Sequence, residues 1–512
     1  SMSSPHVAGA AALLKDLHSN WTPWQIKSAL MLTARTAGVK KEDGATPADP
    51  FDYGSGRIEL RRAGTPGLTL VSPTRADFDG LANELWHLNY PSLYIPVHPG
   101  KTVVERRLRS EVSHPNLWWV SVTSPSDLEI DVQPKFLLIG SGRERTLRIT
   151  VDSSDVPMGD VRHAKLHLSD FHQKLNFPIT IVRNQGVIAL TKSCEPTVFP
   201  EGDQTECTIA LTNTSFDAAS VSVRDRVPSN LHVLTVSGAT GTDVLTFEGD
   251  LEGAEPPDVI AEVDPLASPA GYLPLALFGG NLDIGASDES LANVGIPAFD
   301  YAGESWDTIG VVSNGYIVVG GGSGPDIDFF NTNFPDSERP NNVLAPCWTD
   351  LNPGAGGRVI VNVLTDGLDD WTVVEWEAVP NFSDGELNTC QVWIGSNADA
   401  NPGEDVSFTY GPAISDGDLG FMTVGAENRF GNRGTAVYFD GLGAPPAPSF
   451  PNGNYEIDVF STPGGPGETH TITFTAEGVD DGEWRNCVEM VSDFTFGTSL
   501  ACVEGEVLKP TP

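Results

Sequence analysis

Apolar and polar residues follow two different periods along this chain. Between residues 7 and 17, apolar side chains recur every three or four positions, which is the period of an amphipathic helix. A second helix is predicted after Thr22, a candidate N-cap, because Pro23 suits a first helical position and apolar residues follow at helical spacing. The apolar positions of the two helices are Val7, Ala10, Leu13, Leu14 and Leu17, then Trp24, Ile26, Ala29 and Leu30.

From residue 72 onward the period changes to two. Short runs of alternating apolar and polar residues are separated by turn residues, at the spacing of strands in a sandwich. The runs are 118–123, 128–132, 146–151, 165–168, 175–182, 187–192, 471–477 and 504–508. Glycine (53 residues) and proline (39) are abundant, which fits many turns. The sequence therefore predicts a mostly β protein, in which a short helical segment precedes several β-sandwich domains.

Charge divides the chain at about residue 185. The 512 residues carry 30 Lys and Arg against 69 Asp and Glu, a net charge of −39. Residues 1–185 hold 21 basic and 19 acidic side chains, whereas residues 186–512 hold 9 and 50. A surface this negative repels nucleic acid and anionic lipid. No apolar run reaches the roughly 18 residues of a membrane-spanning helix. We therefore expect a secreted, extracellular protein with no nucleic-acid partner and no transmembrane segment.

All six cysteines lie in the acidic part of the chain. Their spacing favours pairing between neighbours, 194–207, 347–390 and 487–502, out of 15 connectivities. No CxxC pair or histidine cluster accompanies them, so we expect structural disulfides of a secreted protein rather than a zinc site. The sequence has no signal peptide and does not begin with methionine, so we expect a fragment of a longer protein.

The chain opens with the sequence Ser-Met-Ser-Ser-Pro-His-Val-Ala-Gly. A serine at the start of a helix lies in a positive field beside free backbone N–H groups, which suits an oxyanion next to a nucleophile. These residues resemble the nucleophile motif of the subtilisin-like serine proteases (subtilases), Gly-Thr-Ser-Met-Ala/Ser-x-Pro-His-x-Ala-Gly, from its serine onward. Residues 20–23, 26–31 and 51–56 also fit the segments that follow in that family.

The resemblance implies that Ser1 is the catalytic nucleophile of a serine endopeptidase acting on protein or peptide substrates. The aspartate and histidine of the triad precede the serine in this family, so they would belong to the rest of the catalytic domain upstream. His6 follows the serine and is expected to position the helix rather than to act as a base. Without a base, the Ser1 hydroxyl is a weak nucleophile, and residues 1–512 alone are expected to be inactive.

The remaining chain resembles the β modules of extracellular proteins. Residues 1–71 are expected to be the C-terminal piece of a subtilisin-like α/β catalytic domain. They are expected to be exposed, because they lack the parallel sheet on which their helices should pack. Residues 72–185 resemble a fibronectin type III-like domain, on the sequence Leu-Asn-Tyr-Pro-Ser at 88–92. Residues 186–268 resemble the first part of an immunoglobulin-like repeat of bacterial surface proteins. Residues 269–454 resemble a nidogen-like domain, read as an insertion, and residues 455–512 either complete the repeat or form a small separate domain.

Two groups of side chains are candidates for ligand binding. The tryptophans at 306, 348, 371, 376 and 393 could form a surface for an extracellular polymer, although core positions are the commoner place for tryptophan. The aspartates at 326, 328, 366, 369 and 370 could bind calcium, but no calcium-loop pattern appears and solvated loops are the better interpretation. His163 and His167 are interpreted as solvated. We expect no other cofactor or metal.

Two hypotheses for function follow. The first is a secreted subtilisin-like endopeptidase of bacterial type, of which this chain is the C-terminal part. The second is a non-catalytic array of extracellular binding or adhesion modules, or the tail of a pseudoprotease, since most of the chain is acidic, β-rich and free of catalytic motifs.

Overall fold

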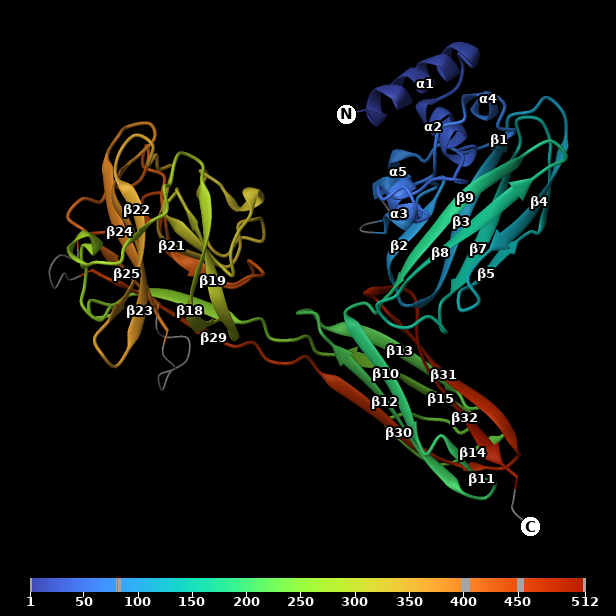
Figure 1. Ribbon diagram of the computed structural model, residues 1–512. Helices are drawn as coiled ribbons and strands as arrows, with labels where there is room; N and C mark the ends of the chain where they lie inside the picture. Colours follow the sequence, from blue (N-terminus) through green and yellow to red (C-terminus); the bar gives the residue numbers. More distant parts are fainter. Residues whose placement is uncertain (1, 80, 82–83, 397–405, 449–454, 510–512) are drawn as a thin grey trace. The chain divides into compact units, whose positions relative to one another are not determined.

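The computed structural model describes residues 2–79, 81, 84–396, 406–448 and 455–509 (Figure 1). The described chain divides into two compact units, one formed by residues 1–253 with 467–512 and the other by residues 254–466. The predicted fold class is confirmed: strands make up most of the regular structure, and the longer helices lie at the N-terminus. Among the described helices, none is long and apolar enough to span a membrane.

The first unit begins with the two predicted helices. Thr22 caps α2 in a reciprocal box, because its Oγ1 accepts from Gln25 N (3.2 Å) while Gln25 Oε1 accepts from Thr22 N (3.0 Å). The helices are α1 (Ser3–Leu17), α2 (Pro23–Leu32), α3 (Pro50–Tyr53), α4 (Leu60–Ala63) and α5 (Arg75–Asp79), with a 3₁₀ turn η1 (Leu85–His87). Both helices predicted from the apolar period are therefore present.

A sandwich follows the helices. One sheet has the order β2 (Leu93–His98), β9 (Lys174–Arg183), β8 (Val161–Ser169), β4 (Asn116–Thr123), β6 (Phe136–Ile139). Facing it are β1 (Leu68–Leu70), β3 (Gly100–Ser110), β7 (Glu144–Asp152) and β5 (Glu129–Gln133). Alternate residues of β3 are buried, as the period of two requires, and they meet Trp118 and Phe177 in the core.

A second sandwich is assembled from two distant parts of the chain. One sheet has the order β10 (Ile188–Glu195), β12 (Gln204–Asn213), β30 (Thr469–Gly478), β14 (Leu231–Ser237). The other has β15 (Val244–Leu251), β13 (Ala219–Arg226), β31 (Gly482–Ser492) and β32 (Thr495–Leu508), with β11 (Val198–Pro200) beside β32. Because β32 also pairs with β3, these strands and β1, β3, β7 and β5 form one nine-stranded sheet that runs through both sandwiches. Because β30 pairs with both β12 and β14, residues after 467 lie inside the fold that begins at residue 188.

The second unit, residues 254–466, is another pair of sheets. The first has the order β16 (Asp258–Val263), β29 (Ile457–Thr462), β25 (Val406–Tyr410), β24 (Leu387–Gly395), β23 (Asp370–Pro380), β22 (Arg358–Thr365), β17 (Leu282–Asp283). The second has β18 (Leu291–Tyr301), β19 (Glu304–Val312), β20 (Tyr316–Val319), β21 (Val343–Trp348), β26 (Thr423–Glu427), β27 (Gly434–Phe439), β28 (Leu442–Gly443). The 3₁₀ turns η2 (Leu275–Leu277) and η3 (Gly324–Asp326) lie between strands.

The core of this unit explains its tryptophans. Trp348, Trp376 and Trp393 are buried, and Trp306 and Trp371 are half-buried, so the interpretation as core residues is confirmed for the first three. They do not form an exposed aromatic surface.

The disulfides join the predicted neighbours. Cys194–Cys207 and Cys487–Cys502 each bridge directly opposed residues of adjacent strands. Cys347–Cys390 connects β21 to β24 and so links the two sheets of the second unit. Every cysteine is paired.

Candidate functional site

The predicted nucleophile, Ser1, lies outside the described residues, and the described chain begins at the helix that follows it. Met2 is the N-cap of α1, and no side chain caps this end. The ring Nδ1 of His6 donates to the Met2 carbonyl at 2.7 Å and so ties down the first turn. The first backbone N–H groups of a helix have no intrahelical acceptor, so the start of α1 can donate to an anion.

Part of the apolar face of α1 packs on the rest of the unit, and the remainder of that face is exposed. Ala10 and Leu14 are buried in a small cluster with residues of α2. Val7, Leu13 and Leu17 belong to the same apolar face but are exposed. The expectation of an exposed N-terminal segment therefore holds for α1.

That expectation is wrong for α2, which packs on the first sandwich. Leu32 belongs to the core of that sandwich, and the buried Ser28 Oγ accepts from Leu70 N of β1 at 2.8 Å. Asn176 Nδ2 of β9 donates to the Ala34 carbonyl at 3.2 Å. The sandwich thus supplies a partner surface for α2.

Residues 51–56, the last part of the subtilase-like sequence, form a tight turn structure. Asp49 caps α3, because its Oδ1 accepts a hydrogen bond from Phe51 N at 2.8 Å. Lys41 Nζ lies 3.1 Å from Asp49 Oδ2 and 3.2 Å from Asp52 Oδ2. The hydrogen bonds that Lys41 donates to Asp49 and Asp52 raise the pKa of Lys41. Gly56 has φ +117°, and a Cβ there would lie 2.8 Å from the Arg35 carbonyl oxygen. The glycine is therefore required by the close approach of these two backbones.

The histidines serve structural contacts in the described chain. His163 Nδ1 lies 2.9 Å from Thr180 Oγ1. His167 is buried and bonds Asn176 Oδ1 at 3.1 Å, so its interpretation as solvated is wrong. His98 is fully buried with its Nδ1 2.7 Å from Ser153 Oγ, and burial, with the charge of Arg183, lowers the pKa of His98 to about 4. The His98–Ser153 pair is inaccessible to substrate because both side chains are fully buried.

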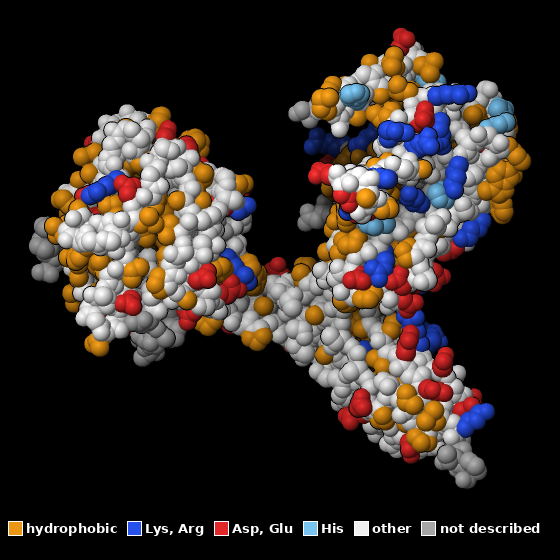
Figure 2. Space-filling view, viewed as in Figure 1, with side chains coloured by type: hydrophobic (Ala, Val, Ile, Leu, Met, Phe, Trp, Pro, Cys, Tyr) orange, Lys and Arg blue, Asp and Glu red, His pale blue; other side chains and the backbone are white. Residues whose placement is uncertain are grey.

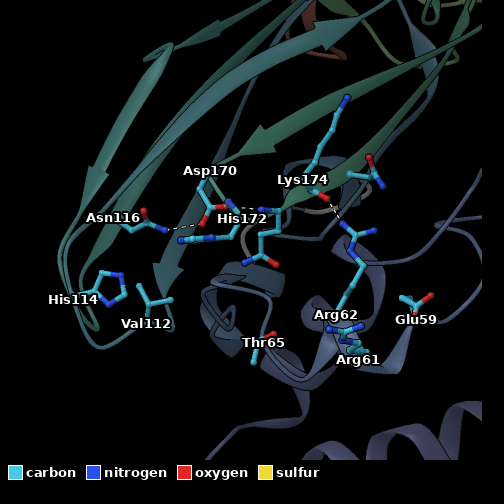
Figure 3. A pocket seen from close by; sticks show the side chains of 12 residues that line it. Glu59, Arg61, Arg62, Thr65, Val112, His114, Asn116, Asp170, His172 and Lys174 are labelled. Atoms are coloured by element: carbon cyan, nitrogen blue, oxygen red, sulfur yellow. Dashed lines mark hydrogen bonds between the residues drawn. The ribbon is translucent and has the colours of Figure 1, made fainter.

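A large basic pocket lies beside α4. Its volume is 840 Å³, and Arg61, Arg62, His114, His172 and Lys174 are among the residues that line it (Figure 3). Lys, Arg and His side chains gather on this part of the molecule (Figure 2). Arg62 Nη2 donates to the Lys174 carbonyl, and the Lys174 side chain extends away from Arg62 (Figure 3). The charged groups of Arg62 and Lys174 therefore do not converge on one point.

The aspartates proposed as calcium ligands are not brought together. Asp326 is buried and pairs with Arg339, whose Nη2 lies 2.7 Å from Asp326 Oδ2, so it is not a solvated loop residue. Asp366 accepts from backbone N–H groups of its own turn, at 2.8 Å from Leu368 N. A different trio does gather in the described chain: carboxylate oxygens of Asp288, Glu289 and Asp350 lie within 4.8 Å of one another. The sequence gives no signal for this trio, because no short motif joins Asp350 to residues 288–289. Calcium binding stays a prediction.

Comparisons with known proteins agree with the N-terminal resemblance. Residues 1–56 match the subtilase family, residues 87–181 match the fibronectin type-III domain, and residues 271–476 match the NIDO-related domain. The chain thus carries a subtilase segment followed by a fibronectin type III-like domain.

Plant subtilisin-like proteases are among its relatives. Subtilisin-like protease SBT5.4 of Arabidopsis thaliana is 28% identical over 35% of this chain and 27% of that protein. SBT1.7 of Arabidopsis thaliana is 32% identical over 35% of this chain and 28% of that protein, and Glyma18g48580 of Glycine max is 31% identical over 36% and 27%. The chain therefore spans little more than a quarter of the length of these relatives.

Solved structures give a weaker likeness. The CupB2 chaperone of Pseudomonas aeruginosa is 15% identical, with coverage of 31% of this chain and 84% of that chain, at a TM-score of 0.16. The BspA C-terminal domain of Streptococcus agalactiae is 7% identical, with coverage of 80% of this chain and 85% of that chain, also at a TM-score of 0.16. These scores are too low to define a shared architecture.

Proposed function

We propose that residues 1–56 are the serine-bearing part of a subtilisin-like endopeptidase domain and that Ser1 is its nucleophile. The match of these residues to the subtilase family carries the proposal. The start of α1 supports it, because an uncapped helix beginning at Ser3 offers backbone N–H donors beside position 1.

In this proposal the Ser1 hydroxyl oxygen attacks the carbonyl carbon of a peptide bond and passes its proton to the base. The base then protonates the amine, which leaves as the C–N bond breaks and an acyl-enzyme remains. The Ser1 N–H donates to the oxyanion of the tetrahedral intermediate, and His6 holds the first turn of α1 in place through Met2. The base and its orienting aspartate precede the serine in subtilases, so an upstream segment supplies them. Residues 1–512 alone are inactive in this proposal, since a serine hydroxyl without a base is a weak nucleophile.

The other modules hold and place the catalytic domain outside the cell. The packing of α2 on the first sandwich, through Ser28 and Leu32, supports a role of that sandwich in stabilising the end of the catalytic domain. The disulfides fit an oxidising, extracellular setting.

A fluorophosphonate probe tests the proposal on the protein with its complete catalytic domain. The adduct is mapped to the tryptic peptide that ends at Lys15 and contains Ser1. We expect labelling in the wild type and in Ser3→Ala, a matched exposed serine, and none in Ser1→Ala or in residues 1–512 alone. Labelling that survives Ser1→Ala, or a folded wild type that takes no label, would refute Ser1 as nucleophile and favour a pseudoprotease.

A further inference from the structure

An aromatic pocket lies in the unit formed by residues 254–466. Its volume is 480 Å³, and exposed apolar side chains line it: Phe329, Phe330, Leu419 and Phe421. Phe330 and Leu419 are each 68% exposed, and the rings of Phe329 and Phe330 lie 4.2 Å apart. Soluble proteins rarely leave large apolar groups clustered around a cavity unless a partner covers them.

The pocket also holds an uncompensated carboxylate. Asp350 lines it, and its buried Oδ1 has no hydrogen-bond partner among the described residues. The other two aspartates of the lining are held by donors: Ser383 N lies 2.8 Å from Asp418 Oδ1, and Asn331 Nδ2 lies 2.8 Å from Asp440 Oδ1. Asp350, which is half-buried, is therefore the lining aspartate whose side chain has no donor among the described residues.

No cationic side chain of the lining neutralises the charge of Asp350. The lining residues, all in the described part of the chain, include no Lys, Arg or His. Asp288 and Glu289 add to the negative field, since their oxygens lie within 4.8 Å of those of Asp350. Burial, followed by the charges of Glu289, Asp418 and Asp288, raises the pKa of Asp350 to about 6.

We propose that this pocket binds a lysine or arginine side chain of a protein partner. Such a side chain combines an apolar stem, which packs against the phenylalanines, with a cation that the ring faces attract. The cation would donate to Asp350 and supply its missing counter-charge. A metal ion would use the carboxylates but not the rings, and a neutral sugar would use the rings but leave Asp350 uncompensated. This site would give the acidic unit a binding role independent of the endopeptidase.

Two peptides that differ only in charge test the proposal. The full chain, residues 1–512, is titrated with acetyl-Gly-Leu-Lys-Leu-Gly-amide and with its uncharged norleucine counterpart, and binding is followed by saturation-transfer NMR at pH 7.5. We expect the lysine peptide to bind at least tenfold more tightly. Equal affinity for the two peptides would overturn the proposal.

Variants assign the effect to the pocket. Asp350→Asn should lower the affinity for the lysine peptide at least tenfold and leave the affinity for the norleucine peptide unchanged. Phe330→Ala should lower the affinity for both peptides. Asp369→Asn, an exposed aspartate outside the lining, is the matched control and should change neither. Lysine-peptide affinity that is the same in Asp350→Asn as in the wild type would overturn the proposal. If circular dichroism shows that Asp350→Asn does not fold, Phe330→Ala tests the proposal instead. Unchanged affinity for both peptides in that variant would overturn it.

Two further arms separate the outcomes. Between pH 7.5 and 5, protonation of Asp350 should lower the affinity of the wild type for the lysine peptide severalfold. The other groups facing this carboxylate, Asp288, Glu289 and Asp418, remain in Asp350→Asn, so the profile of that variant should be flatter. Binding of CaCl₂ that Asp350→Asn abolishes, with no binding of either peptide, would assign the pocket to a metal and overturn the proposal.

Discussion

A buried ion pair holds together the two distant parts of the second sandwich. Lys192 of β10 pairs with Asp225 of β13, and their side chains are 0% and 1% exposed. Lys192 Nζ also donates to Asn486 Oδ1 of β31 at 2.6 Å and lies 5.4 Å from the ring of Phe474 in β30. Burial lowers the pKa of Lys192, and the charge of Asp225 opposes that effect. The pair joins β10 to β13, and its contacts with Asn486 and Phe474 connect strands before and after the unit of residues 254–466.

Lys192→Met removes the cation and leaves Asp225 buried. Removing one partner of a buried ion pair costs about 3–5 kcal/mol, which corresponds to a roughly 10²–10⁴-fold fall in hydrogen-exchange protection at about 1.4 kcal/mol per factor of ten. Exchange is read by mass spectrometry in peptides from β12 and β30, where other domains do not mask the change. The double variant Lys192→Met/Asp225→Leu should recover part of the protection, since it removes the unpaired charge but leaves the buried amide of Asn486 without two of its partners.

Lys135→Met provides the matched control. Lys135 and Asp131 form an exposed pair, with side chains 46% and 48% exposed, and such pairs are worth about 0–1 kcal/mol. Its loss should change protection by less than about sixfold, and only in the first sandwich. A Lys192→Met variant that loses no more protection than Lys135→Met, or a double variant no better than the single one, would refute the argument.

Two further predictions concern the first sandwich. The folded protein keeps His98 neutral, with a pKa of about 4 against 6.5 when unfolded. The unfolded state therefore binds the extra proton first, and stability falls by about 3 kcal/mol as pH drops from 6.5 to 4. Urea midpoints should show this fall in the wild type relative to His98→Asn, and parallel pH profiles would contradict it. Ser28→Ala leaves Leu70 N without its acceptor and should cost about 1–3 kcal/mol. Limited proteolysis should then release residues 1–71 faster than in Ser3→Ala, and equal release rates would show that this hydrogen bond does not anchor α2.

Helix α2 shows which structural features the local sequence pattern can predict and which it cannot. Thr22 and Pro23 marked its start, and the structure has both the cap and the helix. These features could be predicted because a cap depends on residues three positions apart. The surface that α2 covers could not be predicted in this way, because Leu70 lies 42 residues from Ser28. Likewise His167 carries no sequence signal of burial, which comes from its place in β8 between β4 and β9.

The sequence by itself determined the fold class, the two helices and the disulfide pairs, and it indicated the subtilase segment through a continuous motif. In most of these cases the deciding residues are near in sequence or lie on adjacent strands, as Cys194 and Cys207 do. The exception is Cys347–Cys390, which joins residues 43 positions apart in two different sheets. Only the tertiary structure decided that β30 pairs with β12, that Lys192 and Asp225 are desolvated together, and that Asp350 meets Phe330 and Phe421 in one pocket. The physical reason is that strand pairing and burial depend on contacts between residues far apart in the chain, whereas periodicity and capping depend on the next turn alone.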